Sequence, residues 1–355
     1  MFTQSHWRIF DGILSAASEL FPIIKTGGLA DVTGALPAAF ATLGVSIRTI
    51  IPGYPQVLKS VSGLKHEADL LVLGERAAIL SARHQGIDLL VFHCPSLFDR
   101  EGGPYTDAHG VDYVDNWKRF AALSFATAKV AEGLVHGWRA DVVHLHDWQT
   151  GLAAAYLKAA DSNVPITFTI HNLAFQGHFS PEIFAALELP ARFNSTEHLE
   201  YYGGISFLKA GINFSDTITT VSPTYAREIL TDELGMGMHG VLWARQRDLK
   251  GIVNGIDVNV WDPSSDPLIA MNYDSRSLGR RAANKRAVED RFGRSASQYV
   301  ETYSKILDYR ATQDAAARKL LLASVLASGQ NPQTRGRRVP LAARLKQVGH
   351  APSMS

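Results

Sequence analysis

The order of apolar runs along the chain predicts an α/β protein with a doubly wound parallel sheet and a helical C-terminal segment. Short buried runs typical of strands alternate with longer runs that have helical spacing. A loop with two adjacent glycines separates the first predicted strand from the first predicted helix. Polar residues follow two later strands. Because open parallel sheets bind ligands at such strand ends, these observations predict a binding site there.

The composition fits one large domain or two, and it argues against several classes of function. The chain has 355 residues, of which 46% are hydrophobic, and this supports a sizeable core. Its net charge of +1 does not indicate a nucleic-acid or membrane partner. The sequence contains no run of about eighteen apolar residues, so we expect no membrane span. Residues 1–8 lack the apolar core of a signal peptide, and the single cysteine permits no intrachain disulfide, so we expect a cytoplasmic protein.

The first third of the chain predicts a strand, a helix and several further strands. The apolar run at 12–17 predicts a buried strand, and residues 29–43 have the apolar spacing of a helix. A second strand at 45–51 is ended by the Pro-Gly-Tyr-Pro sequence that follows it. Further strands are expected at 70–73, 77–83 and 89–93, with a turn at 86–88.

The middle of the chain continues the alternation. A polar loop opens at 97–105, and long loops of this kind are often functional. Ser222 as N-cap and Pro223 at the first helical position mark the start of a late helix. The remaining expected elements are helices at 116–135 and 149–160 and strands at 142–145, 165–170, 216–222 and 251–257.

The loop between the first strand and the first helix predicts an anion site. Its central sequence is Lys-Thr-Gly-Gly at 25–28. N–H groups at a helix start point outward, and glycine lets a phosphate approach the backbone closely. Lys25 adds a positive charge beside that position. The alternative is that Gly27 and Gly28 form an ordinary turn and that Lys25 is a surface lysine.

Residues 18–32 resemble the KTGGLADV loop of bacterial glycogen synthases and plant starch synthases. Those enzymes transfer glucose from ADP-glucose to the end of an α-1,4-glucan with retention, and they need no separate cofactor. Their fold, called GT-B, consists of two facing Rossmann-like domains. The resemblance implies that Lys25, Gly27, Gly28 and Asp31 bind substrate, and that the partners are ADP-glucose and a glucan such as glycogen.

Two further motifs lie at strand ends and resemble segments of the same family. His-Asp-Trp at 146–148 matches the family's HxHDW segment, and His-Asn-Leu-Ala-Phe-Gln-Gly at 171–177 resembles its T[VI]HNLAYQG. The resemblance implies that His171 contacts the donor glucose and that Asp147 accepts hydrogen bonds from glucose hydroxyls, which makes these the two candidate catalytic residues. Asn172 is a candidate substrate-binding residue. The alternatives are a structural histidine and an aspartate that caps the next helix.

Tyr105 and Asn254 are further candidates for substrate binding. The polar loop that contains Tyr105 resembles the family's loop at the acceptor end of the cleft, and an aromatic face suits the apolar face of a sugar ring. A tyrosine that anchors its own turn is the alternative. Asn254 lies in a segment that matches the family's GI[VL]NGID, and the alternative for it is a turn residue in an Asn-Gly pair.

Metal and nicotinamide chemistry are disfavoured by the motifs. His144 and His146 are spaced by two residues on one predicted strand, but no third ligand is evident, so we expect no metal site. No G-x-G-x-x-G sequence follows the first strand, which argues against an NAD-dependent oxidoreductase. A catalytically inactive glucan-binding remnant of a synthase remains as the second alternative.

The resemblance is nearly continuous up to Gly293 and then changes. An intact synthase would enter its second Rossmann-like domain there, but no SRLxxQKG-like or EPCGL-type segment follows. Residues 294–328 instead resemble the family's final helix. An internal deletion and a misassembled gene model both explain this, and either leads us to expect impaired or absent activity. The predicted organisation is an extension at 1–11, a first domain at 12–262, a linker and helix at 263–293, the terminal helix, and a disordered tail at 329–355.

Overall fold

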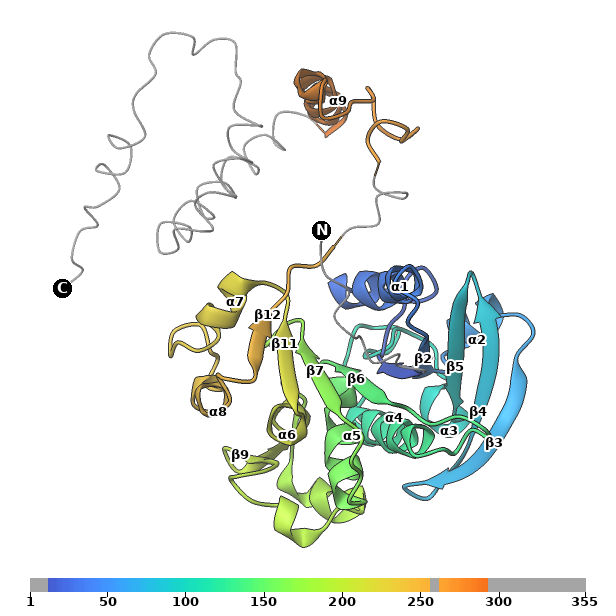
Figure 1. The fold of residues 1–355 in the computed structure, drawn as a ribbon, viewed down its shortest axis with the longest axis vertical. Coiled ribbons are helices and arrows are strands. Elements are labelled where there is room, and N and C mark those ends of the chain that lie inside the picture. Colours follow the sequence, from blue (N-terminus) through green and yellow to red (C-terminus); the bar gives the residue numbers. More distant parts are fainter. Residues whose placement is uncertain (1–11, 256–261, 293–355) are drawn as a thin grey trace, which may run out of the picture. The chain divides into compact units, whose positions relative to one another are not determined.

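The computed structural model describes residues 12–255 and 262–292 (Figure 1). They belong to two compact units that meet in sequence after Asp257. The predicted N-terminal extension, terminal helix and C-terminal tail lie outside the described residues. The first unit contains a nine-stranded sheet with helices packed against it (Figure 1).

The strand order of this sheet is β12-β11-β7-β6-β1-β2-β5-β4-β3. Neighbouring strands from β12 to β5 are parallel, whereas β4 is antiparallel to β5 and β3 is antiparallel to β4. The strands are β1 (Ile13–Ala16), β2 (Ile47–Pro52), β3 (Lys65–Val72), β4 (Glu75–His84), β5 (Ile87–His93), β6 (Val142–His146), β7 (Ile166–Ile170), β11 (Thr217–Thr220) and β12 (Leu249–Gly251). The expected α/β class and Rossmann-like sheet are confirmed, with a mixed rather than an entirely parallel sheet.

Three details of the strands differ from the sequence-based expectation. β3 begins at Lys65 rather than at residue 70, because its first residues are exposed and show no apolar pattern. The turn between β4 and β5 is Gln85–Gly86, both with positive φ as in type I′ hairpins, so residues 87 and 88 belong to β5. β12 ends at Gly251, where the last strand was expected to begin.

The helices expected at 29–43, 116–135 and 149–160 are present as α1, α4 and α5, whereas no bounds were predicted for α2, α3, α6 and α8. Ser222 caps α7 as predicted, since its hydroxyl accepts the N–H of Tyr225 at 2.9 Å. In Figure 1, α4, α5 and α6 lie side by side. The helices are α1 (Gly28–Ala41), α2 (Pro55–Ser60), α3 (Pro95–Phe98), α4 (Asn116–Ala131), α5 (Trp148–Ala159), α6 (Phe207–Phe214), α7 (Pro223–Glu228) and α8 (His239–Ala244).

The contact between α5 and α6 depends on glycine. A Cβ atom on Gly151 would lie 2.1 Å from the carbonyl oxygen of Phe207, a distance that no side chain tolerates. A Cβ atom on Gly211 would lie 2.5 Å from the ring of Phe168 on β7. The two glycines therefore let α6 approach both α5 and the sheet, and this close packing buries the core of the first unit.

The remaining described elements are short. A three-stranded antiparallel sheet of β8 (His178–Phe179), β10 (Gly204–Ser206) and β9 (Glu200–Tyr201) lies between β7 and α6 in the chain, with 3-10 turns η1 (Pro181–Leu187) and η2 (Ala191–Phe193). The second unit contains η3 (Leu278–Arg280) and α9 (Arg281–Phe292), which lie in the segment 263–293 where a linker and a helix were expected. In the described part of the chain, none of the helices combines the length and apolar character needed to cross a bilayer.

The topology fixes where a ligand site is expected. From β1 the chain passes through α1 to β2 on one side, whereas β6, on the other side of β1, leads through α5 to β7. The winding direction therefore reverses between β1 and β6. Ligands of open α/β sheets bind at this switch point, outside the carboxyl ends of the strands. The loops after β1, β6 and β7 all begin at that edge.

Candidate active site

The loop after β1 is organised around the carboxylate of Glu19, which is only 3% exposed. Its Oε2 accepts the N–H groups of Thr26 and of Gly27, the latter at 3.2 Å. Its Oε1 accepts the hydroxyls of Thr26 and Tyr105, each at 2.5 Å. Charge-assisted hydrogen bonds of this kind are stronger than neutral ones. One buried carboxylate therefore fixes the glycine loop and attaches a distant tyrosine to it.

Gly27 and Gly28 lie at the open N-terminus of α1. Gly27 is the N-cap residue with extended backbone angles, φ −146° and ψ −167°, and Gly28 is the first helical residue. A Cβ atom on either residue would meet nothing within 4 Å. Neither packing nor a left-handed conformation therefore requires glycine here. The structure leaves free space at the end of a helix, where an anion is favoured.

Lys25 does not extend freely from this loop. Its Nζ donates to both carboxylate oxygens of Asp31 at 2.7 Å, and both side chains are more than 40% exposed. Asp31 lies in the first turn of α1, where a carboxylate interacts favourably with the helix dipole. The lysine charge is therefore held beside Gly27 and Gly28, but it is shared with Asp31.

Tyr105 reaches the same loop from the segment between α3 and α4. Its hydroxyl contacts Ser18 Oγ at 2.8 Å and donates to Glu19, and its ring packs on Phe120 with centroids 5.8 Å apart. Burial raises the pKa of Tyr105 well above its usual range, so the hydroxyl remains a donor. The tyrosine therefore anchors its loop to the end of β1. Stacking of its ring on a sugar stays a prediction.

Asp147 follows β6 directly and occupies an unusual position. Its backbone has φ 56° and ψ −176°, close to a region that is populated almost only by glycine. Its side chain does not cap α5, as one interpretation of the sequence expected. Instead, Oδ1 accepts the N–H of His171 at 2.7 Å, and the N–H of Asn172 also contributes a hydrogen bond. Burial raises the pKa of Asp147 to about 7, and the charge of Glu19 adds to this rise.

His171 is the last member of a chain of hydrogen bonds that starts in the core. Ser15 Oγ lies 3.2 Å from Nε2 of His146, and Nδ1 of His146 lies 3.0 Å from Nε2 of His171. Each imidazole has one donor and one acceptor nitrogen, so the tautomer of His146 sets that of His171. Burial lowers the pKa of His171 to about 4 and lowers that of His146 well below its usual range, so both rings are neutral at pH 7.

His144 and His146 have different hydrogen-bond partners. Its Nε2 contacts Thr169 Oγ1 at 2.7 Å, and Thr169 in turn contacts Thr219 Oγ1 at 2.6 Å. Burial lowers the pKa of His144 to about 4. Within residues 12–255 and 262–292, no group of three His, Cys, Asp or Glu side chains is arranged to hold a metal ion.

The two candidate asparagines are both exposed. Asn172 follows His171, and its side-chain oxygen accepts the N–H of Ala174 at 3.0 Å, which closes a local turn. Asn254 lies three residues beyond β12. Their roles in substrate binding stay predictions.

The structure brings most of the candidates to one edge of the sheet. Glu19 links the loop of Gly27 to Tyr105, and its charge also acts on Asp147. Sequence reasoning did not single out Glu19, although a carboxylate directly after the first strand was a usable signal. It also missed the link from Ser15 to His146, because residues 131 positions apart share no local pattern.

This arrangement suits a ligand with an anionic group and several hydroxyls. The open N-terminus of α1 and Lys25 favour an anion. The carboxyl group of Asp147 and the neutral ring of His171 are hydrogen-bonding groups at neighbouring strand ends. Such fixed groups can orient a polyhydroxylated molecule.

The chain is similar to known proteins over most of its length. Residues 12–244 match the family described as "Starch synthase catalytic domain". The chain is 51% identical over 283 residues to a glycogen synthase of Rhizobium johnstonii and 51% identical over 284 residues to glycogen synthase 1 of Rhizobium meliloti. Each alignment covers 79% of this chain but 59% of the relative, so the chain spans less than two thirds of the length of these relatives.

A solved structure shows the same fold. It is the catalytic domain of starch synthase IV from Arabidopsis thaliana bound to ADP and acarbose. The TM-score is 0.69 at 28% sequence identity, and the match covers 81% of this chain and 60% of the Arabidopsis chain.

Proposed function

Because the chain belongs to the starch synthase family of glycosyltransferases, we propose that it serves the transfer of glucose from ADP-glucose to the non-reducing end of an α-1,4-glucan. The proposed transfer retains the anomeric configuration and uses no separate cofactor, and we place it in the cytoplasm. The observation that carries this proposal is the open space at Gly27 and Gly28, at the switch point of the sheet.

The donor diphosphate is proposed to bind at the start of α1. There the oxygens can approach the backbone of Gly27 and Gly28, because no side chain fills that space. Lys25 supplies a positive charge on the same loop, where its Nζ also contacts Asp31 at 2.7 Å. Neutralising the departing diphosphate is the main electrostatic requirement of such a transfer.

The transferred glucose is proposed to lie against the ends of β6 and β7. His171 is neutral and Asp147 is held by backbone N–H groups, so both present fixed hydrogen-bonding atoms toward sugar hydroxyls. We propose that Asn172, Asn254 and Tyr105 contribute further contacts to the donor or the glucan. Holding both sugars away from water limits hydrolysis of the donor.

We expect the 355-residue chain by itself to transfer glucose slowly or not at all. The residues described here form one wall of the proposed site, and each lost contact to a developing charge costs about 3 kcal/mol in comparable enzymes. Binding of the substrates is a less demanding property than turnover. We therefore propose that the chain retains weak affinity for ADP-glucose and for glycogen.

The test measures binding and turnover on the same protein. Calorimetry with ADP-glucose, sedimentation with glycogen, and incorporation of labelled glucose into glycogen are compared for the wild-type chain and for Lys25→Ala. Saturable ADP-glucose binding that is weakened about tenfold or more in Lys25→Ala is expected. A folded chain that binds neither ADP-glucose nor glycogen and transfers no glucose contradicts the proposal. Rapid incorporation would support the function and refute the expected low turnover.

A further inference from the structure

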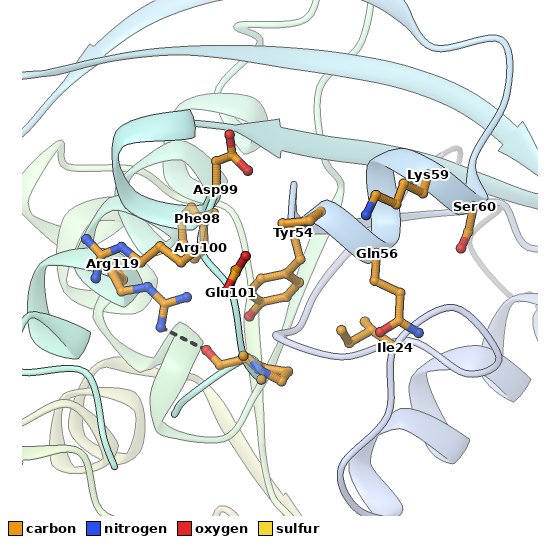
Figure 2. Close-up of a pocket in the computed structure, with 14 residues that line it drawn as sticks. Ile24, Tyr54, Gln56, Lys59, Ser60, Phe98, Asp99, Arg100, Glu101 and Arg119 are labelled. Atoms are coloured by element: carbon orange, nitrogen blue, oxygen red, sulfur yellow. Dashed lines mark hydrogen bonds between the residues drawn. The ribbon is translucent and has the colours of Figure 1, made fainter. Parts of the chain in front are cut away.

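A cavity of about 770 Å³ lies between α2 and the segment that joins α3 to α4 (Figure 2). Cavities of this size hold small organic molecules in other proteins. Its lining includes Ile24 but neither Gly27, Gly28 nor the groups at the ends of β6 and β7. The proposed donor site therefore does not account for it.

A buried cation that forms no ion pair within the described residues lines this cavity, although the charge of Asp115 acts on it. Arg119 on α4 is 1% exposed, yet it forms no ion pair with any carboxylate in the described part of the chain. Its Nε donates to the carbonyl of Leu97, and its Nη1 donates to the carbonyl of Pro104 and to Asn116 Oδ1. Its Nη2 has no hydrogen-bond partner among residues 12–255 and 262–292. Buried charges are normally paired, so a buried guanidinium with an unused donor group is unusual.

Aromatic rings stabilise the cation but do not neutralise it. The guanidinium carbon of Arg119 lies 4.5 Å from the ring centre of Tyr113, 5.0 Å from that of Phe98 and 5.5 Å from that of Phe120. Cation–π contacts of this kind explain how the charge is tolerated in the interior. They leave only the Nη2 group available for an anion, and a charge-assisted hydrogen bond from it to a phosphate oxygen would be strong.

A second unpartnered donor faces the same space. Tyr54 is 3% exposed, and its buried hydroxyl has no hydrogen-bond partner in the part of the chain that the structure describes. Figure 2 shows this hydroxyl and the guanidinium of Arg119 turned toward the same part of the cavity. Burial raises the pKa of Tyr54 despite the nearby positive charge of Arg119, so the hydroxyl stays protonated and can donate.

The exposed side chains that line the cavity, at its mouth, are polar and include Lys59. Arg100 is held by Asp115 through two hydrogen bonds of 2.6 Å, whereas Lys59 forms no ion pair with the described residues. Gln56, Ser60 and Glu101 add side chains that can bind hydroxyl groups. The cavity thus combines two buried donors with several polar side chains, in a space large enough for a sugar.

We propose that this cavity binds a sugar phosphate, with Arg119 Nη2 and the Tyr54 hydroxyl donating to the phosphate oxygens and Lys59 attracting the anion at the mouth. The site is separate from the proposed donor site, and the proposal does not depend on glucose transfer. Inorganic phosphate shares the recognised group but leaves the sugar-sized part of the cavity empty. It should therefore bind more weakly than the sugar phosphate.

Calorimetry on the full 355-residue chain tests this with glucose 6-phosphate, inorganic phosphate and maltose as probes. We expect saturable binding of glucose 6-phosphate. Inorganic phosphate should bind more weakly and compete with glucose 6-phosphate, whereas maltose should not compete with it. Tyr54→Phe removes only the hydroxyl and should raise the Kd for glucose 6-phosphate about tenfold. Lys59→Gln, an exposed change, should raise it about threefold and reduce its dependence on salt.

Two control variants locate the binding. Tyr202→Phe removes a hydroxyl from an exposed tyrosine that does not line the cavity, and it should leave the Kd unchanged. Lys25→Ala should also leave it unchanged, which distinguishes the cavity from the proposed donor site. Absence of saturable binding, an unchanged Kd in Tyr54→Phe, or loss of binding in Lys25→Ala would each overturn the proposal. Maltose that displaces glucose 6-phosphate would show a site for neutral sugar instead.

Discussion

The backbone N–H of His171 donates a 2.7 Å hydrogen bond to Oδ1 of Asp147. This bond ties the residue after β7 to the residue after β6, so the two candidate catalytic residues are positioned by one another. Asp147 adopts its strained backbone conformation at the same point. Because backbone strain is tolerated mainly where the surrounding structure or function requires it, this pair is the part of the site that we expect to respond most to mutation.

Gly28→Ala should separate ligand binding from stability. A methyl group at residue 28 meets no atom, so the free energy of unfolding should stay the same or rise by up to about 1 kcal/mol. ADP-glucose affinity should nevertheless fall, because the methyl group occupies the proposed phosphate position. Gly151→Ala is the contrasting variant: its Cβ would lie 2.1 Å from a backbone oxygen, and we expect a loss of more than about 2 kcal/mol. Urea denaturation and calorimetry measure both effects, and equal stability losses would contradict the prediction.

Glu19→Gln should loosen the glycine loop. The amide group replaces an acceptor oxygen with a donor, which then faces N–H or O–H groups of Thr26 or Tyr105. We expect a loss of about 1–3 kcal/mol in the free energy of unfolding. Hydrogen exchange at residues 25–28 should also become faster. Tyr105→Phe, which leaves the bonds to Thr26 in place, should affect exchange in the loop much less. Protection of the loop that is unchanged in Glu19→Gln would count against the central role of this carboxylate.

Asp147→Asn should change how stability depends on pH. The pKa of this carboxyl is raised to about 7 in the folded chain, against about 3.9 when it is unfolded. The folded state therefore binds the proton more tightly, and the wild type loses stability from this group as the pH rises from 4 to 7. Relative to the wild type, the free energy of unfolding of the Asn variant should rise by up to about 4 kcal/mol across that range. Urea titrations at several pH values measure the difference, and a difference independent of pH would show that Asp147 is ionised throughout.

His144→Gln tests the buried histidines. Their effect on how stability depends on pH has the opposite sign to that of Asp147. The pKa of His144 is lowered to about 4, so folding favours the neutral ring. Its contribution is complete above the unfolded pKa of about 6.5 and is lost as the pH falls from there toward 4. Between pH 7 and pH 5, His144 should lower the free energy of unfolding of the wild type by up to about 2 kcal/mol. Glutamine can keep the contact with Thr169 Oγ1 but does not titrate, so the variant should lose less stability over this interval. An identical loss in both proteins would refute the assignment.

The sequence predicts the parallel part of the sheet and the edge that carries the site. Apolar runs such as 142–145 and 165–170 mark β6 and β7 because both faces of a central strand are buried. The polar residues that follow, Asp147 and His171, then fall at neighbouring strand ends. Their placement depends only on strand order and direction, which the alternation of strands and helices makes predictable.

Other features could not be predicted because they join residues that are far apart in the sequence. Tyr105 meets Glu19 across 86 residues, and no periodicity connects a loop to a strand end. Tyr54 and Arg119 line one cavity although they belong to the start of α2 and to α4. Capping of α5 by Asp147 was one alternative from the sequence, but the backbone N–H that its side chain accepts is that of His171, which follows another strand. In each case tertiary packing decides the partner.

The exposed face of β3 has a consequence for how the protein behaves in solution. β3 is the last strand of the sheet, so its outer backbone groups can pair with a strand from another molecule. Lys65, His66 and Glu67 are all exposed there, and the pairing with β4 shifts register between His66 and Ala68. Charged side chains and an irregular edge both hinder addition of a further strand. The same polar residues that concealed the beginning of β3 from the apolar pattern therefore protect the sheet from growing into an aggregate.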